Sequence, residues 1–127
     1  MAVEGGSAID TSLTADADLS AKQYKFVKMS SDGQVAVAAA ATDNILGVLQ
    51  DTDADAAGKA CAVRVAGETK LVAGGTIDEG QYLTSDANGD AVATTTDKER
   101  IGAIALEAAS DNDIFRALIV HFTLSAA

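Results

Sequence analysis

The sequence predicts an all-β protein, a compact sandwich-like or barrel-like domain, and three observations lead to this fold class. Short apolar runs are separated by Gly, Asp, Asn and Ser, at the spacing of about 8–12 residues that is typical of sandwiches and barrels. Apolar residues alternate with a period of two at Cys61, Val63 and Val65, as in a strand that buries one face. Helical candidates are limited to two short alanine-rich stretches, residues 36–41 and 105–109.

The first residues of the chain show no such periodicity. Glycines and small polar residues surround the isolated apolar residues Val3, Ile9 and Leu13. We expect residues 1–14 to form an extended N-terminal arm that is ordered only against another surface, because terminal segments are poorly ordered unless something holds them. Residues 15–127 are then a single β domain.

Turn signals delimit the strands of this domain. The first candidate strand ends at the turn of residues 30–33, where Gly33 can adopt a positive φ. A polar loop covers residues 51–58, Gly67-Glu68 makes a tight turn, and the strand pattern resumes after Gly74-Gly75. The predicted strands are residues 23–29, 34–38, 45–50, 60–66, 69–73, 81–84, 90–95, 101–106 and 114–124.

A weak internal repeat suggests that the domain consists of two duplicated β units. Similar segments recur at offsets that drift slowly, as insertions and deletions in loops would make them. The paired segments are 23–24 with 81–82, 45–48 with 101–104, and 62–65 with 117–120. Two halves of similar length would then pack together or intertwine.

The hydrophobic content overstates the core. The chain is 48% hydrophobic, but 27 of those 61 residues are alanine. Burial stabilises at roughly 25 cal/mol per Å² of apolar surface, and an alanine buries little. Because the core is thin, we expect burial against copies of the same chain or against a partner. The aromatic residues are Tyr24, Phe26, Tyr82, Phe115 and Phe122.

The charge excludes several partners. The formal net charge is −10, which opposes binding to nucleic acid because that binding depends on Lys and Arg. An anionic membrane surface is disfavoured for the same reason. The sequence has no run of 18 apolar residues and no basic N-terminal region followed by an apolar one, so we expect synthesis in a cytoplasm.

Acidic clusters do not match a calcium loop. Asp51, Asp53 and Asp55 resemble the start of an EF-hand, but Ala56 and Ala62 occupy the positions of its glycine and bidentate glutamate. The segment Asp86-x-Asn88-x-Asp90 fails in the same way. We therefore expect these carboxylates to be solvated and expect no metal site.

No catalytic or cofactor site is predicted either. His121 is the only histidine, which excludes a multi-histidine metal site, and we interpret it as a half-exposed strand residue. Cys61 is the only cysteine, so no internal disulfide can form; its apolar neighbours indicate a buried thiol. Gly74-Gly75-Thr76 lacks the lysine and the spacing of a phosphate loop.

Three stretches resemble the capsid decoration (cement) proteins of tailed bacteriophages. They are residues 18–50, which include Lys22-Gln-Tyr-Lys-Phe-Val-Lys-Met29, residues 60–75, and residues 100–107. The likeness extends over about residues 18–120 and lies in glycines and β-branched positions. Some relatives carry a proline in the loop that here spans residues 51–57, and this chain has no proline, so the resemblance does not define the conformation of that loop.

The resemblance implies a structural protein with no active site and no cofactor. Proteins of this kind bind the exterior of the expanded phage head, often as homotrimers at local three-fold positions, and reinforce the shell. The partner implied is the major capsid protein, and the location is the outside of the virion capsid, after synthesis in the host cytoplasm. Val3, Ile9 and Leu13 are the candidate capsid contacts, chosen because they are isolated apolar residues in the predicted arm.

Two other functions compete with this one. A carbohydrate- or receptor-binding β module of a head fibre would stack sugars on exposed aromatic rings, and this chain has five aromatic residues and no tryptophan. An enzyme is the third hypothesis, with His121 as the residue to substitute. The composition by itself indicates assembly, and only the resemblance indicates the phage head.

Overall fold

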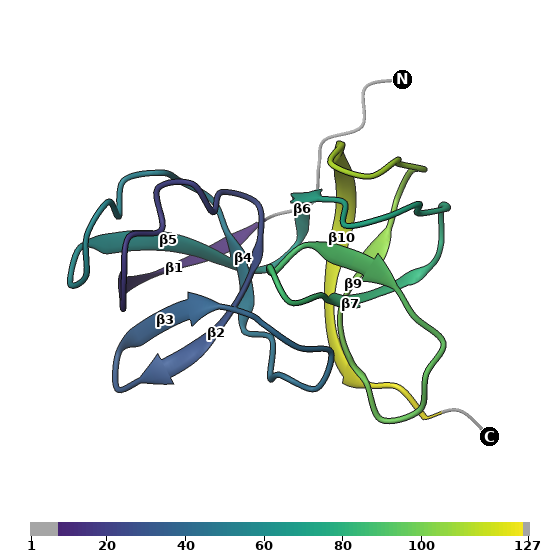
Figure 1. Cartoon of the computed structure of the whole chain (residues 1–127), viewed down its shortest axis with the longest axis horizontal. Coiled ribbons are helices and arrows are strands. Elements are labelled where there is room, and N and C mark those ends of the chain that lie inside the picture. The colour runs from purple at the N-terminus through teal and green to yellow at the C-terminus, as the bar shows by residue number, and fades with distance from the viewer. Residues whose placement is uncertain (1–7, 126–127) are drawn as a thin grey trace.

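Residues 8–125 are described by the computed structural model and form ten β-strands and no helix (Figure 1). The all-β fold is thus as predicted. The strands are β1 (Ile9–Ala15), β2 (Phe26–Ser31), β3 (Gln34–Val37), β4 (Gly47–Leu49), β5 (Ala60–Ala66), β6 (Glu68–Val72), β7 (Tyr82–Ser85), β8 (Ala91–Ala93), β9 (Arg100–Ala105) and β10 (Ile114–Thr123). Strand β5 has the predicted bounds, and β2 to β4 and β6 to β10 lie within three residues of theirs.

The strands form two five-stranded units, which lie side by side (Figure 1). The first unit is a closed barrel of order β1-β3-β2-β4-β5, and the second is a sheet of order β6-β10-β9-β7-β8. The barrel closes where Ala15 pairs with Val35 in parallel. In the second unit a single parallel bridge, from Ala73 to Ala91, stands at the corresponding place.

The two units repeat one topology, as the duplication predicted. The order β3-β2-β4-β5-β1 of the first unit becomes β8-β7-β9-β10-β6 in the second. The register agrees as well. Phe26 pairs with Val48, which pairs with Arg64, and Tyr82, Ile104 and Leu118 form the equivalent row.

Strand β1 occupies part of the predicted arm. Residues from Ile9 onward pair with β5 in six registered positions, so residues 9–14 are extended but belong to the barrel. The sequence showed no alternation here because both faces of β1 are mostly exposed and polar until Ala15. Residues 1–7 lie outside the described residues, and for them the arm stays a prediction.

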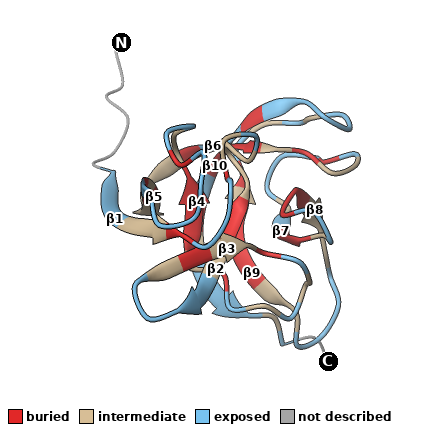
Figure 2. Ribbon diagram, turned by 60° about the vertical axis from the view of Figure 1, so that its left-hand side comes forward, coloured by how far each residue is buried: buried red, intermediate tan, exposed pale blue. Residues whose placement is uncertain are grey.

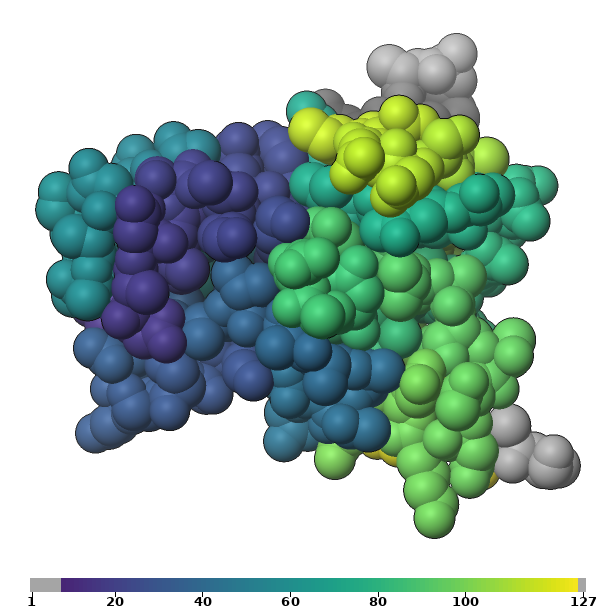
Figure 3. All heavy atoms as spheres, in the orientation of Figure 1, coloured from purple at the N-terminus to yellow at the C-terminus, as the bar shows by residue number. Residues whose placement is uncertain are grey.

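The molecule has two hydrophobic cores, one inside the barrel and one between the two units. Inward side chains of the barrel, including Val27, Val35 and Val63, form one cluster. The second cluster joins the second unit to Phe26 and Val48, which point out of the barrel and are fully buried. Figure 2 shows that the buried segments lie toward the centre of the molecule, and Figure 3 shows the two halves in contact across a broad front.

The junction between the units is tight because small residues line it. The backbone N–H of Phe26 donates to the carbonyl of Gly89 at 2.9 Å, and the Phe26 ring lies against Gly102, where an added Cβ would be 2.7 Å from Cε1. An ion pair of 2.6 Å between Lys25 Nζ and Asp90 Oδ1 crosses the same junction and is largely shielded from solvent. These contacts fix the two units as one body.

Candidate functional site

The predicted contact residues have different environments. Ile9 is 58% exposed at the start of β1, where Figure 2 shows an exposed ribbon. Leu13 is half-buried and packs against the barrel core, so its side chain is committed to the fold. Val3 lies outside the described residues. Of the three, Ile9 is therefore the one that the structure displays.

The carboxylates of the two acidic loops form hydrogen bonds and an ion pair with groups nearby in the chain. Asp51 Oδ2 accepts the N–H of Ala62 at 3.1 Å, and Asp55 pairs with Lys59 at 2.7 Å. Asp86 Oδ1 accepts two backbone N–H groups, from residues 88 and 90, and so closes the turn between β7 and β8. Residues 8–125 contain no group of three or more His, Cys, Asp or Glu side chains placed to hold a metal ion.

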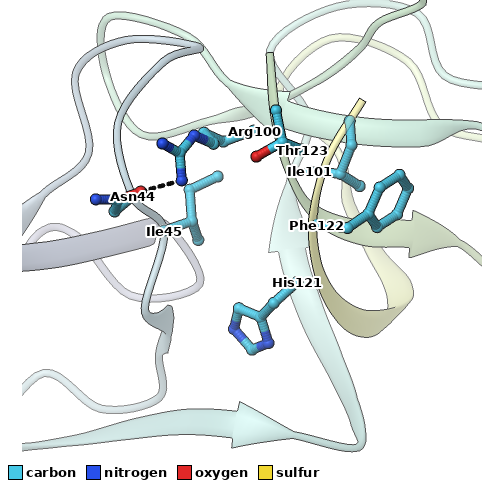
Figure 4. Close-up of a pocket in the computed structure, with 7 residues that line it drawn as sticks. All are labelled: Asn44, Ile45, Arg100, Ile101, His121, Phe122 and Thr123. Carbon is cyan, nitrogen blue, oxygen red and sulfur yellow. Dashed lines mark hydrogen bonds between the residues drawn. The ribbon is translucent and has the colours of Figure 1, made fainter. Parts of the chain in front are cut away.

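His121 lies at the rim of a hollow of about 240 Å³ between the two units. Its Nε2 is 2.8 Å from the carbonyl oxygen of Leu46 and donates to it, which ties β10 to the first unit. Arg100 donates to Asn44 across the same hollow, and Phe122 points to the other side (Figure 4). The lining contains no carboxylate, serine or cysteine. His121 therefore makes a structural hydrogen bond between the two units.

Cys61 is 2% exposed inside the barrel. Burial raises the pKa of its thiol, and the negative charge of Asp51 raises that pKa further. A thiol held in its protonated form is a poor nucleophile and metal ligand.

Within residues 8–125 no helix is long and apolar enough to cross a bilayer.

The outer face of the second unit carries the largest exposed apolar side chains. Antiparallel sheets with one buried face usually present polar residues on the other, but Leu118 is 40% exposed and Tyr82 is 41% exposed on this face. The rings of Tyr82 and Phe122 pack edge to face, with centroids 5.1 Å apart. Exposed large hydrophobic residues of the second unit are Tyr82, Leu106, Ile114, Leu118 and Phe122.

The sequence does not reveal this face because β10 carries apolar residues on both of its faces. Phe115 and Ile119 face the core, whereas Ile114 and Leu118 alternate with them and are exposed. The register shifts between Ile119 and Phe122, where β10 has one residue more than β9. A bulge of this kind re-aims the side chains that follow it. No sequence pattern marks the position of the bulge.

Two hollows lie at the surface of the molecule, one on each unit. One, of about 460 Å³, is lined by uncharged residues of the second unit: Gly80, Gln81, Tyr82, Ala93, Thr94 and Thr95. The other, of about 450 Å³, lies on the first unit and is lined by Lys28, Met29, Asp43, Asn44, Ile45 and Leu46. Met29 at its edge is 46% exposed. Both hollows are open to solvent.

Basic side chains from both units surround Tyr24 near the junction. Arg64, Lys70 and Arg116 line a hollow of about 350 Å³ around Tyr24, and the Lys70 ammonium lies 5.8 Å from the ring centroid. Arg64 pairs with Asp10, and Arg116 pairs with Glu68 in the same hollow. This surface is therefore close to neutral, although the chain as a whole has a charge of −10.

The profile of the phage cement protein family matches residues 3–120. The chain belongs to the phage cement protein family. The cement protein is thus a structural protein of the phage head surface, located on the exterior of the virion capsid, as the sequence resemblance implied. No curated protein sequence matches it.

A solved structure resembles this cement protein over nearly its whole length. The N base of head fiber gp8.5 in bacteriophage phi29 aligns with a TM-score of 0.69 and 21% sequence identity, over 94% of this chain and 100% of that one. At this identity the likeness shows a shared fold. The duplicated all-β architecture of the cement protein therefore has a counterpart among proteins of phage heads.

Proposed function

We propose that this cement protein binds the major capsid protein on the outside of the phage head and stabilises the shell as a homotrimer, without a catalytic step. The observation that carries the proposal is the surface itself. Large apolar side chains remain exposed on a protein with few of them, and the apolar residue Ile9 is displayed beside the N-terminal end of the chain. Exposed apolar surface of this kind marks sites of protein association.

Shell binding uses the N-terminal end in this proposal. Val3 and Ile9 contact the major capsid protein, whereas Leu13 holds β1 on the barrel core. A fully buried isoleucine contributes about 1.5–3 kcal/mol, which is weak for one arm. Three arms on one trimer bind as a unit, because each arm that is already bound raises the effective concentration of the others. A protein that binds only the expanded shell then stabilises that shell by mass action.

The test compares two equally exposed isoleucines. Ile9 and Ile114 are each 58% exposed and lie in different units. Heads of the parent phage that lack the protein are incubated with the full chain, with Ile9→Ser, with a variant lacking residues 2–8, or with Ile114→Ser, and occupancy is measured after sedimentation. We expect Ile9→Ser to lose about tenfold in affinity, the truncation to lose more, and Ile114→Ser to bind normally.

Unchanged occupancy for both N-terminal variants contradicts the contact. Circular dichroism of each variant is the control for folding. The truncation stops before Ile9 because β1 is a barrel strand, and removing it would open the barrel. Occupied heads should also resist heat and pressure better than bare ones, and equal resistance would contradict the stabilising role.

Recognition of a neutral glycan is a second candidate function. The hollow of about 460 Å³ combines the exposed Tyr82 ring with uncharged polar side chains of Gln81 and Thr95. Sugars stack on aromatic rings and hydrogen-bond to such groups. Binding of the isolated protein to a glycan array, lost in Tyr82→Ala, would support this function; an array without signal removes it.

A further inference from the structure

The contact between the two units of one chain uses a turn that fills a notch. On the second unit, Gly89 lies in the turn between β7 and β8 with a φ of +79°. Its carbonyl accepts the N–H of Phe26, and a Cβ added to it would meet Val37 and lie 3.3 Å from the Cβ of Lys25. The first unit therefore presents a notch at residues 25, 26 and 37, and the Gly89 turn occupies it.

The strand register identifies the equivalent notch on the second unit. Val27 pairs with Gly47 and Val37, and Leu83 pairs with Ala103 and Ala93 in the same pattern. Residues 25, 26 and 37 of the first unit therefore correspond to Gln81, Tyr82 and Ala93 of the second. Those three residues line the hollow of about 460 Å³. Phe26 is fully buried, whereas Tyr82 is 41% exposed.

The first unit carries the part that would fill this hollow. By the same register, Gly89 corresponds to Gly33 in the turn between β2 and β3, and Gly33 has a φ of +73°. That turn is exposed, and no heavy atom lies within 4 Å of a Cβ placed on Gly33. Its contact with the rest of the chain is through the Gly33 carbonyl, which accepts hydrogen bonds from the N–H and the hydroxyl of Thr14 at 3.1 Å. Each chain thus has one filled notch, one open notch and one turn whose outer side is exposed.

We propose that the turn of residues 31–33 of one copy inserts into the open notch at Gln81, Tyr82 and Ala93 of the next copy, head to tail. The contact repeats between chains the junction that already exists within each chain. Contacts between two different surfaces close into a ring when the rotation allows it. The inference rests on the homotrimer of the proposed function and names its interface. Three chains would then form a ring of six similar units.

The charges at this contact permit association of two acidic chains. The intrachain junction carries the ion pair of Lys25 and Asp90, and the equivalent positions of the interchain contact are Gln81 and Gln34. All residues that line the open notch are uncharged. Each chain has a net charge of −10, but the notch that receives the turn contributes no negative charge to the contact.

One difference makes the interchain contact shallower. The Phe26 ring lies on Gly102, and the position equivalent to Gly102 is Leu46, which lines the hollow beside Met29. The Tyr82 ring of the neighbouring copy would therefore lie against the Leu46 side chain instead of backbone. A shallower contact suits an interface between chains, which has to form after each chain has folded.

Single-cysteine variants test the pairing directly. Gly33→Cys and Gln81→Cys are matched because, at the equivalent intrachain positions, a Cβ added to Gly89 lies 3.3 Å from the Cβ of Lys25, close to the 3.5–4.5 Å of a disulfide. Because a cysteine at Gly33 is strained by the positive φ, Asp32→Cys is tested in parallel. Each variant is oxidised alone and in equimolar mixtures, and non-reducing electrophoresis is used as the readout. The unmodified chain, with only buried Cys61, is the control for background cross-linking.

We expect no cross-link from any variant alone and a covalent dimer from the mixtures of a turn variant with Gln81→Cys. A chain with both Asp32→Cys and Gln81→Cys should give a ladder that ends at a covalent trimer. Cross-linking of a single variant with itself would indicate a two-fold contact and overturn the proposal. Mixtures that give no dimer would overturn it as well.

A charge substitution gives an independent readout. Native mass spectrometry should show the concentration for half-dissociation rising at least tenfold in Tyr82→Glu and staying unchanged in Ile114→Glu. Equal effects of the two variants, or a monomeric parent chain at high concentration, would overturn the interface. If these tests fail while trimers still occupy phage heads, the proposed function stands without this interface. If they succeed and the protein does not bind heads, the proposed function fails.

Discussion

Gly102→Ala should destabilise the protein by closing the space that the Phe26 ring occupies. The added Cβ would lie 2.7 Å from Cε1 of Phe26 and 3.0 Å from Cγ2 of Ile45. Phe26 is fully buried and Ile45 nearly so, so neither can move freely. Extra carbon atoms in a packed core cost about 1–3 kcal/mol, and replacing a glycine returns about 0.4–1 kcal/mol through the unfolded chain. We expect a net loss of about 1–2 kcal/mol in the free energy of unfolding.

Urea denaturation followed by far-ultraviolet circular dichroism measures this loss. Gly75→Ala is the matched control, because no atom lies within 4 Å of its added Cβ and its φ is not in the left-handed region. All variants are compared at one protein concentration, since self-association contributes to apparent stability. We expect Gly75→Ala to be as stable as the parent chain or slightly more stable.

A double-mutant cycle isolates the contact. Phe26→Leu removes the ring edge that meets the new Cβ, so Gly102→Ala should cost less in that background, with a coupling energy of about 1 kcal/mol. If Gly102→Ala is as stable as Gly75→Ala, or if the two changes are additive, the ring does not pack on Gly102 and the account of the junction is refuted.

Three further outcomes are expected. Lys25→Met should lower the free energy of unfolding, measured by urea denaturation, by about 1–3 kcal/mol, because Asp90 is left shielded from solvent without its partner. Lys59→Met removes an exposed ion pair and should change the free energy of unfolding by less than about 0.5 kcal/mol. Equal effects of the two substitutions would contradict this expectation. The N–H of Ala39 and, secondarily, Lys28 lower the pKa of Asp43. The stability that this provides is present above the ordinary pKa and is lost as pH falls through the lowered pKa. Asp43→Asn should therefore be less stable at pH 7, by about 1 kcal/mol, and equal to the parent near pH 2; parallel stability curves would refute this. Because burial raises the pKa of the Cys61 thiol, a thiol reagent at pH 8 should label it only after denaturation, and fast labelling of the folded protein would contradict its burial.

The duplicated fold explains why a short chain with a thin core still has an exposed apolar face. The first unit buries Phe26 and Val48 against the second, whereas the equivalent Tyr82 stays exposed and Ile104 half-buried. The packing of the two units in this chain therefore leaves one such face without a partner within the chain. The face that lacks one is where the proposed neighbour binds.

Much of the fold follows from local patterns. The alternation in β5 and the turn residues around Gly33 and Gly67 are determined by interactions between near neighbours in sequence, and they placed the strands within a few residues. Strand β1 was not recognised because its side chains are mostly exposed and polar. Its pairing with β5 depends on backbone hydrogen bonds, which leave little trace in composition.

The sequence alone determined the fold class, the duplication and the family, because strand periodicity, turn chemistry and repeated segments are properties of neighbouring residues. The tertiary structure decided which copy of each repeated position is buried. Phe26 and Tyr82 are equivalent in register and both aromatic, and no local pattern says that one packs on Gly102 while the other meets solvent. That choice depends on contacts between residues about 60 to 80 positions apart, such as Phe26 with Gly89 and Gly102, and those contacts exist only once the chain has folded.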